Sequence, residues 1–220
     1  MFGWYFGRKL KNRYLSFSKL ENYHQLFKDL SADTSIPNIA TNLVYIIKAN
    51  DPEQVESKVI QSIFSKQPKR AKTYWLLHVD RTDEPERFEY KVTHIIPGLL
   101  VRVDFMLGFK IEPKINLYFK EVLEDLSKSG EIKQESCFDC INKHSLPPDF
   151  RFILIDRVMP LDAELPFRKK MILRLHNISR LLALPETEVL QMDAANTFEE
   201  RVPLTVNRLP EERITRIKKA

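Results

Sequence analysis

Glycine and cysteine are both scarce in this chain, and each scarcity disfavours a class of site. Only five of the 220 residues are glycine. Loops that cradle phosphate need glycine so that backbone N–H groups can approach the ligand, so P-loop and dinucleotide-binding sites are disfavoured. The two cysteines, Cys137 and Cys140, cannot build a disulfide framework, which favours a reducing compartment.

A long hydrophobic run is also missing. A helix needs about 20 mostly apolar residues to cross a bilayer, and no uncharged run in this sequence reaches about 18. We therefore expect no membrane-spanning helix in this chain. With 43% hydrophobic and 30% charged residues, the composition predicts a folded protein with a sizeable core.

Positive charge is concentrated at the start of the chain. The formal net charge is +5, yet residues 1–31 alone hold six basic residues against two acidic ones. Nucleic-acid-binding proteins usually spread Lys and Arg over a folded face or a reading helix. The localised charge therefore predicts no nucleic-acid partner.

Aromatic rings accompany this charge. Such rings favour the membrane–water interface, and Lys and Arg collect on the cytoplasmic side of spanning helices. The pattern predicts a membrane-interface segment made of Trp4, Tyr5, Arg8, Lys9, Lys11 and Arg13. The other interpretation is that Trp4 and Phe6 pack on the folded domain.

Hydrophobic periodicity predicts alternating helices and strands. Helical spacing predicts an amphipathic helix over residues 16–30, and continuous apolar runs predict buried strands over residues 41–49 and 73–79. Between the strands we expect a helix that begins at Asp51, the N-cap, with Pro52 in its first turn. A strand, helix and strand in this order favour parallel pairing.

The rest of the sequence adds a hairpin and further elements. Pro-Gly at residues 97–98 predicts a turn between strands over residues 88–96 and 99–105, and alternation in the second strand predicts that Arg102 and Asp104 lie on a solvated face. Further elements are expected at residues 115–126 (helix), 150–158 (strand), 165–182 (helix) and 202–206 (edge strand). The fold class is mixed α/β, a mainly parallel sheet with a β-hairpin, flanked by helices.

Two groups of polar residues are candidates for ligand binding. The basic residues Lys69, Arg70 and Lys72 follow a predicted helix, where they can bind a phosphate or anionic lipid or simply meet the helix dipole. Asp80 follows the predicted strand over residues 73–79, and residues 48–51 lie at the end of the predicted strand over residues 41–49. α/β proteins bind ligands at the carboxyl ends of parallel strands.

The motif Cys137-Phe-Asp-Cys140, with His144 nearby, provides only part of a zinc site. A structural zinc ion takes four ligands, and the remaining histidines are scattered singly. We expect ordinary thiols, no bound metal and no cofactor. A nucleophile with an elbow glycine is also missing, so we expect no enzyme.

Three runs together carry a family resemblance. These are residues 36–85 (IPNIATNLVYIIKANDPEQVESKVIQSIFSKQPKRAKTYWLLHVDRTDEP), 102–126 (RVDFMLGFKIEPKINLYFKEVLEDL) and 149–158 (DFRFILIDRV). In this order they resemble the C-terminal cytoplasmic domain of KUP/HAK/KT-type potassium uptake transporters, in particular the Bacteroidetes-like branch. The leading GRKLKNRYLSFSKLENYHQLFKDLSAD resembles the link that follows the last transmembrane helix in that branch.

The resemblance implies a parent protein that imports potassium, by proton symport, with this domain on the cytoplasmic face of the inner membrane. It implies a juxtamembrane linker and amphipathic helix over residues 1–31, an α/β domain over 32–207 and a basic tail over 208–220. The implied partners are the transmembrane domain of the same transporter, the membrane surface and a second copy. We expect a regulatory or assembly role; the alternative is a nucleotide or cyclic-dinucleotide sensor.

Overall fold

The computed structural model describes residues 15–132, 135–144, 147–158, 190 and 196–203. Its first half contains β1 (Phe17–Lys19), the 3-10 helix η1 (Leu20–Tyr23), α2 (His24–Ala32), β2 (Asn38–Ile47), β3 (Gln54–Glu56), α3 (Ser57–Gln61) and the π-helix η2 (Ser62–Lys66). Its second half contains β4 (Arg70–Thr82), β5 (Phe88–Ile96), β6 (Leu100–Gly108), α4 (Ile115–Lys128), α5 (Asp139–Lys143), β7 (Phe150–Val158) and β8 (Thr197–Pro203).

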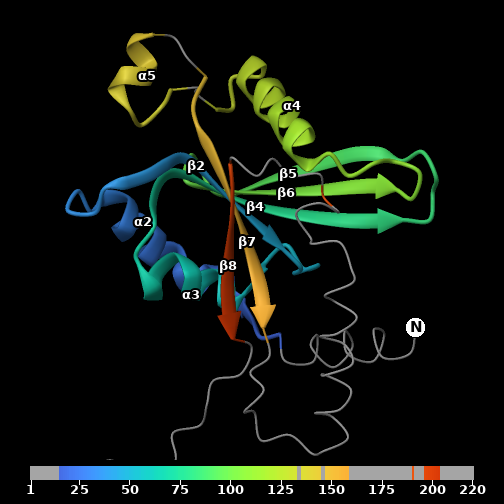
Figure 1. Cartoon of the computed structure of the whole chain (residues 1–220), viewed down its shortest axis with the longest axis horizontal. Helices are drawn as coiled ribbons and strands as arrows, with labels where there is room; N and C mark the ends of the chain where they lie inside the picture. Colours follow the sequence, from blue (N-terminus) through green and yellow to red (C-terminus); the bar gives the residue numbers. More distant parts are fainter. Residues whose placement is uncertain (1–14, 133–134, 145–146, 159–189, 191–195, 204–220) are drawn as a thin grey trace, which may run out of the picture.

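A six-stranded sheet in the order β5-β6-β4-β2-β7-β8 forms the centre of the fold (Figure 1). Neighbouring strands are parallel, except that β5 and β6 form an antiparallel hairpin. The hairpin turns at Gly98, whose φ of 72° lies in the left-handed region that glycine adopts without strain. The predicted mixed sheet with a hairpin is confirmed.

Helices cover both faces of this sheet. One core cluster joins β2 and β4 to α2 and α3, through side chains such as Phe27, Leu43 and Tyr74. The other joins the opposite face to α4, through side chains such as Val44, Trp75 and Phe119. Residues 40–47 of β2 are buried without interruption, which confirms the prediction of a strand buried on both faces.

The start of the described chain differs from the predicted helix over residues 16–30. Phe17–Lys19 is a strand, β1, which pairs antiparallel with β3 in a separate two-stranded sheet, and the α-helix begins only at His24. Leu20 and Phe27 are nevertheless buried, as the periodicity requires. Backbone pairing with β3 outweighs the helical preference of the first residues.

The helix predicted from Asp51 also begins later. Asp51 accepts a hydrogen bond from the Glu53 N–H, which makes a turn, and β3 follows before α3 begins at Ser57. Val55, Val59 and Ile63, three apolar residues of the predicted helix, are nevertheless fully buried. Their burial does not require one continuous helix.

Other predictions are confirmed with shifted limits or lie outside the described residues. The helix at α4 and the strand at β7 are confirmed, and the edge strand is β8 rather than residues 202–206. β4 begins at Arg70, among the basic residues that follow the predicted helix. Residues 1–14, which hold the membrane-interface segment, the helix predicted over 165–182 and the tail over 208–220 lie outside the described residues. In the described part, no helix has both the length and the apolar character that crossing a membrane requires.

Candidate functional site

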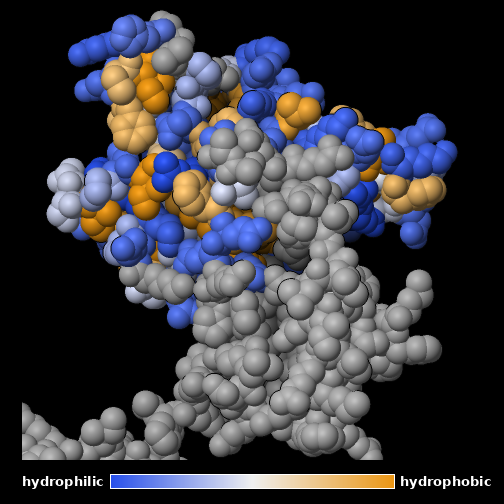
Figure 2. Space-filling view, in the orientation of Figure 1, coloured by the Kyte–Doolittle hydropathy of each residue, from blue (hydrophilic) through white to orange (hydrophobic). Residues whose placement is uncertain are grey.

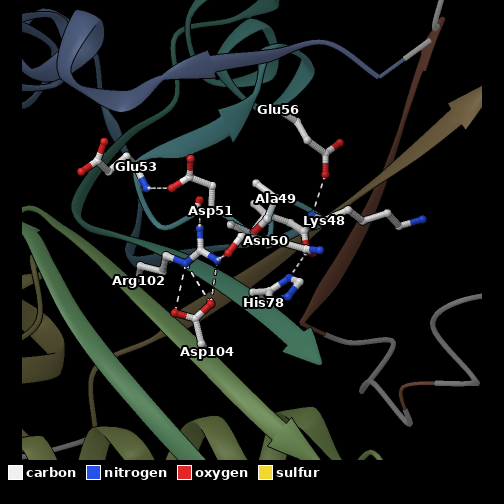
Figure 3. Close-up of polar contacts among 10 residues, drawn as sticks. Lys48, Ala49, Asn50, Asp51, Glu53, Glu56, His78, Arg102 and Asp104 are labelled. Carbon is white, nitrogen blue, oxygen red and sulfur yellow. Dashed lines mark hydrogen bonds and ion pairs between the residues drawn. The ribbon is translucent and has the colours of Figure 1, made fainter. Parts of the chain in front are cut away.

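The loop of residues 48–53, called here the β2–β3 loop, lies where β2, β4 and β6 run side by side toward their carboxyl ends. The register places Ile47, His78 and Asp104 next to one another on these three strands. The loop therefore leaves β2 at the level of His78 and Asp104, where polar side chains of the neighbouring strands can reach it (Figure 3).

Arg102 of β6 holds the loop through its backbone. The side chain is fully buried, and its Nη2 and Nη1 donate to the carbonyl oxygens of Ala49 and Asp51, each at 2.7 Å. On its other side, Nε and Nη2 donate to the Asp104 carboxylate at 2.9 and 2.7 Å. Figure 3 shows the guanidinium group between the carboxylate and the loop.

This arrangement corrects the expectation of a solvated face. Arg102 has 0% exposed side-chain area and Asp104 has 18%. A buried guanidinium is tolerated because a carboxylate neutralises it and carbonyl groups accept its remaining N–H donors. The sequence does show that Arg102 and Asp104 share a face, since they are residues i and i+2 of one strand. Alternation alone, however, does not distinguish a solvent-exposed face from a buried ion pair.

A second buried charged residue holds the start of the same loop. The Glu56 side chain is fully buried, and its Oε1 accepts a hydrogen bond from the backbone N–H of Lys48 at 2.6 Å. Glu56 belongs to β3, so the short two-stranded sheet and the β2–β3 loop are joined directly. Sequence reasoning missed this residue because nothing local marks one glutamate of a charged stretch as buried.

The first described strand is attached at the same place. β1 pairs with β3, and the Leu20 N–H donates to the Glu53 carbonyl at 2.9 Å. The hydroxyl groups of Ser18 and Ser57 also lie 2.9 Å apart. A continuous set of hydrogen bonds thus runs from β1 through β3 and the β2–β3 loop to Arg102 on β6.

The structure divides the candidate ligand-binding residues into two places. Asp80 is exposed near the carboxyl end of β4, while Arg70 begins that strand. A strand rises about 3.3 Å per residue, so the two residues lie about 30 Å apart. The basic residues at one end and Asp80 with the β2–β3 loop at the other therefore do not form a single site.

Each of the three basic residues contacts neighbouring parts of the fold. Lys69 Nζ lies 3.2 Å from a carboxylate oxygen of Glu200, and Lys72 Nζ donates to the Glu135 carbonyl at 2.9 Å. Arg70 donates to the carbonyl of Ser31 at the end of α2 and to that of Ile36. These contacts give all three side chains a structural role.

The two cysteines lie apart from the Arg102 site. Both are free thiols; Cys140 is exposed, and Cys137 Sγ accepts a hydrogen bond from the Thr41 hydroxyl at 3.4 Å. Burial raises the pKa of the Cys137 thiol. No set of three or more Cys, His, Asp or Glu side chains suited to holding a metal ion occurs among the described residues.

Comparison with known proteins identifies the family. The model of the K+ potassium transporter C-terminal domain matches residues 40–205, from β2 through the end of the sheet. The chain belongs to this family. The resemblance read from the sequence is thereby confirmed.

Several proteins that are similar to this chain carry the name "Probable potassium transport system protein Kup". Those of Cytophaga hutchinsonii and Flavobacterium psychrophilum are 36% and 35% identical over 97% and 98% of this chain, and that of Clostridium perfringens is 31% identical over 93%. The chain spans only 33%, 33% and 31% of their lengths. No solved structure matches the chain.

Proposed function

We propose that this chain is the cytoplasmic domain of a potassium uptake transporter and that it regulates the gating or assembly of the transmembrane part. Its parent is a K+/H+ symporter, potassium is the substrate of that parent, and the domain itself needs no cofactor. Membership of the K+ potassium transporter C-terminal domain family supports this proposal, as do the names of the relatives. The domain acts at the cytoplasmic face of the inner membrane.

The hydrogen-bonded connection from β1 to Arg102 is the observation that carries the regulatory role. A soluble domain changes a transporter only if its contacts differ between transport states. Because β1 is bonded to β3, and Glu56 of β3 to the β2–β3 loop, movement of the chain that leads into β1 is transmitted to the sheet. Arg102 completes the connection by fixing the loop to β6.

A nucleotide-sensing role is the second proposal. The position of the β2–β3 loop at the carboxyl ends of parallel strands favours it. The orientation of the loop counts against it, since the carbonyl groups of Ala49 and Asp51 point at Arg102.

Uptake by the full-length transporter tests the proposal. Removing residues 32–220 is expected to change rubidium uptake or assembly severalfold in cells that lack other potassium importers. Arg102→Lys is expected to act in the same direction, because an ammonium group cannot bridge the Asp104 carboxylate and two loop carbonyls as the planar guanidinium does.

Arg151→Lys is the matched control, because this arginine of β7 lies over the Phe198 ring and not against a buried loop. Its uptake should equal that of the wild type at equal expression. Unchanged uptake, assembly and regulation after removal of residues 32–220 would contradict the proposed function. Repeating the measurement in proteoliposomes with ATP or a cyclic dinucleotide separates the two proposals, because only a sensor responds to them.

A further inference from the structure

β5 is an edge strand of the described six-stranded sheet. In the six-stranded sheet β5 pairs with β6, and among the described residues no strand lies on its other side. The Gly108 N–H donates to the carbonyl of Arg87, so the backbone of odd-numbered residues points toward β6. Successive residues alternate in a ladder, so the N–H and C=O groups of Phe88, Tyr90 and Val92 point outward.

The side chains of β5 divide into an apolar and a charged face. Phe88 packs edge-on against Tyr118 of α4 with ring centroids 4.7 Å apart, and the Tyr90 hydroxyl donates to Asp125 of the same helix. Phe88 remains 50% exposed and Tyr90 42%. Glu89 and Lys91 are exposed and, by strand alternation, point to the opposite face.

Charge selects one register for the antiparallel pairing of β5 with a second β5. A two-fold axis at Lys91 would set Lys91 opposite itself, and an axis at Val92 would set Lys91 opposite Thr93. An axis at Tyr90 places Glu89 of each copy directly across from Lys91 of the other copy. Cross-strand neighbours of unlike charge stabilise a strand pair, whereas neighbours of like charge destabilise it. Within the described residues Lys91 forms no ion pair of its own, whereas Glu89 Oε2 lies 2.9 Å from Arg87 Nε.

The same axis at Tyr90 also matches the apolar face. It sets Phe88 of one copy opposite Val92 of the other, twice, and the two Tyr90 rings beside each other. The exposed Phe88 and Tyr90 are thereby covered, and the outward N–H and C=O groups of residues 88, 90 and 92 find partners. With this axis, each residue from 88 to 92 therefore lies across from a residue of the other copy that suits it in charge or in apolar character.

We propose that two copies of this chain associate through antiparallel β5–β5 pairing about a two-fold axis at Tyr90. The two sheets then form one continuous sheet, with both α4 helices on the same face. The pairing itself is a property of the isolated chain. Its biological use rests on the proposed function, since a dimeric transporter holds two such domains on one side of the membrane. Figure 2 shows hydrophilic residues predominating on the arm formed by β4, β5 and β6, with small hydrophobic areas among them.

Charge reversal tests the register. In sedimentation of the concentrated chain, Glu89→Lys and Lys91→Glu alone are each expected to raise the dimer dissociation constant about tenfold, because the symmetry repeats every new like-charge pair. The double variant Glu89→Lys/Lys91→Glu restores the opposite charges and should return to the wild-type value. Lys110→Glu makes the same charge change in the turn after β6 and should leave dimerisation unchanged.

Cysteine cross-linking provides a second measurement. In a background in which Cys137 and Cys140 are serine, Tyr90→Cys should cross-link to itself under mild oxidation, because residues on the axis have Cα atoms about 5.5 Å apart. Self-cross-linking at position 91 or 92 instead would overturn the register. A chain that stays monomeric without cross-links, or a dimer indifferent to both charge reversals, would overturn the interface.

Neither measurement involves transport. A dimer without any effect of the domain on uptake would refute the proposed function and leave the interface standing. A chain that stays monomeric but affects uptake would refute the interface and leave the proposed function standing.

Discussion

At the scale of residues, two buried tyrosines place phenol groups inside the face covered by α2 and α3. The Tyr74 hydroxyl donates to the Lys69 carbonyl at 2.7 Å and accepts from the Ala71 N–H at 3.1 Å, and the Tyr45 hydroxyl lies 3.1 Å from that of Ser62. Burial raises the pKa of Tyr74 to about 12 and that of Tyr45 as well. Both groups must therefore be neutral in the folded state.

Alkaline pH is expected to destabilise the fold through these groups. The folded pKa of Tyr74 lies above its ordinary value of 10.0, so its contribution is complete below pH 10 and falls as pH rises toward about 12. The unfolding free energy should fall by about 1.4 kcal/mol per pH unit for each such tyrosine in this window. Urea unfolding from pH 8 upward measures the slope, and Tyr74→Phe should make it shallower; an equally steep slope in Tyr74→Phe would contradict the assignment.

Residue-scale prediction from the sequence succeeded for apolar side chains and failed for buried charges. The apolar positions of β2 and of α3 could be predicted because periodicity reports burial directly. Arg102 and Glu56 could not, because a charged residue becomes buried only when its partners arrive from elsewhere in the chain. For Arg102 those partners are loop carbonyls about 50 residues earlier.

At the scale of elements, one fully buried aromatic side chain of α4 packs against several rings of the sheet. Phe119 makes edge-to-face contacts with Trp75 of β4 and with Phe152 and Phe150 of β7, at centroid distances of 5.2, 5.7 and 6.2 Å. Phe119 is fully buried, whereas Leu117, two residues earlier, is 53% exposed. Through this inner face the helix packs against both β4 and β7.

Phe119→Ala is expected to lower the unfolding free energy by about 3–5 kcal/mol, because it removes a buried ring and leaves a cavity among the other aromatic rings. Leu117→Ala, on the exposed side of the same helix, should change it by no more than about 0.5 kcal/mol. Urea unfolding at neutral pH measures both values. Equal effects of the two substitutions would show that α4 does not hold the sheet in this way.

Element types were predictable where one strong local pattern decides them. β2 contains a continuous apolar run, and the β5–β6 hairpin has its Pro-Gly turn. β1 and β3 were missed because three-residue strands exist only through their pairing with each other. The site was predictable in position, at the carboxyl end of β2, but not in its chemistry.

At the scale of the whole molecule, an ion pair joins β8 to the short segment between η2 and β4. Lys69, just before β4, contacts Glu200 of β8 at 3.2 Å, and the Ser62 hydroxyl of η2 donates to the same carboxylate oxygen at 2.6 Å. Both charged side chains are largely buried, at 14% and 17% exposure. The edge strand is thus attached by side chains as well as by its ladder with β7.

Lys69→Gln is expected to loosen β8, because the mostly buried Glu200 carboxylate loses its cationic partner. Amide hydrogen exchange of Thr197–Pro203 should become about tenfold faster, the effect of losing one charge-assisted contact. Lys72→Gln, an exposed lysine two residues into β4, should leave these amides unchanged. If both variants exchange alike, Lys69 does not attach β8.

The central position of β2 has a consequence for biosynthesis. One neighbour, β4, begins at Arg70, soon after β2 ends, but the other, β7, begins only at Phe150. At about 5–20 residues per second, the ribosome needs roughly 5–20 s to add the hundred or so residues in between. During that time β2 has one open edge, so nascent chains that end between β2 and β7 are the forms that most need a chaperone.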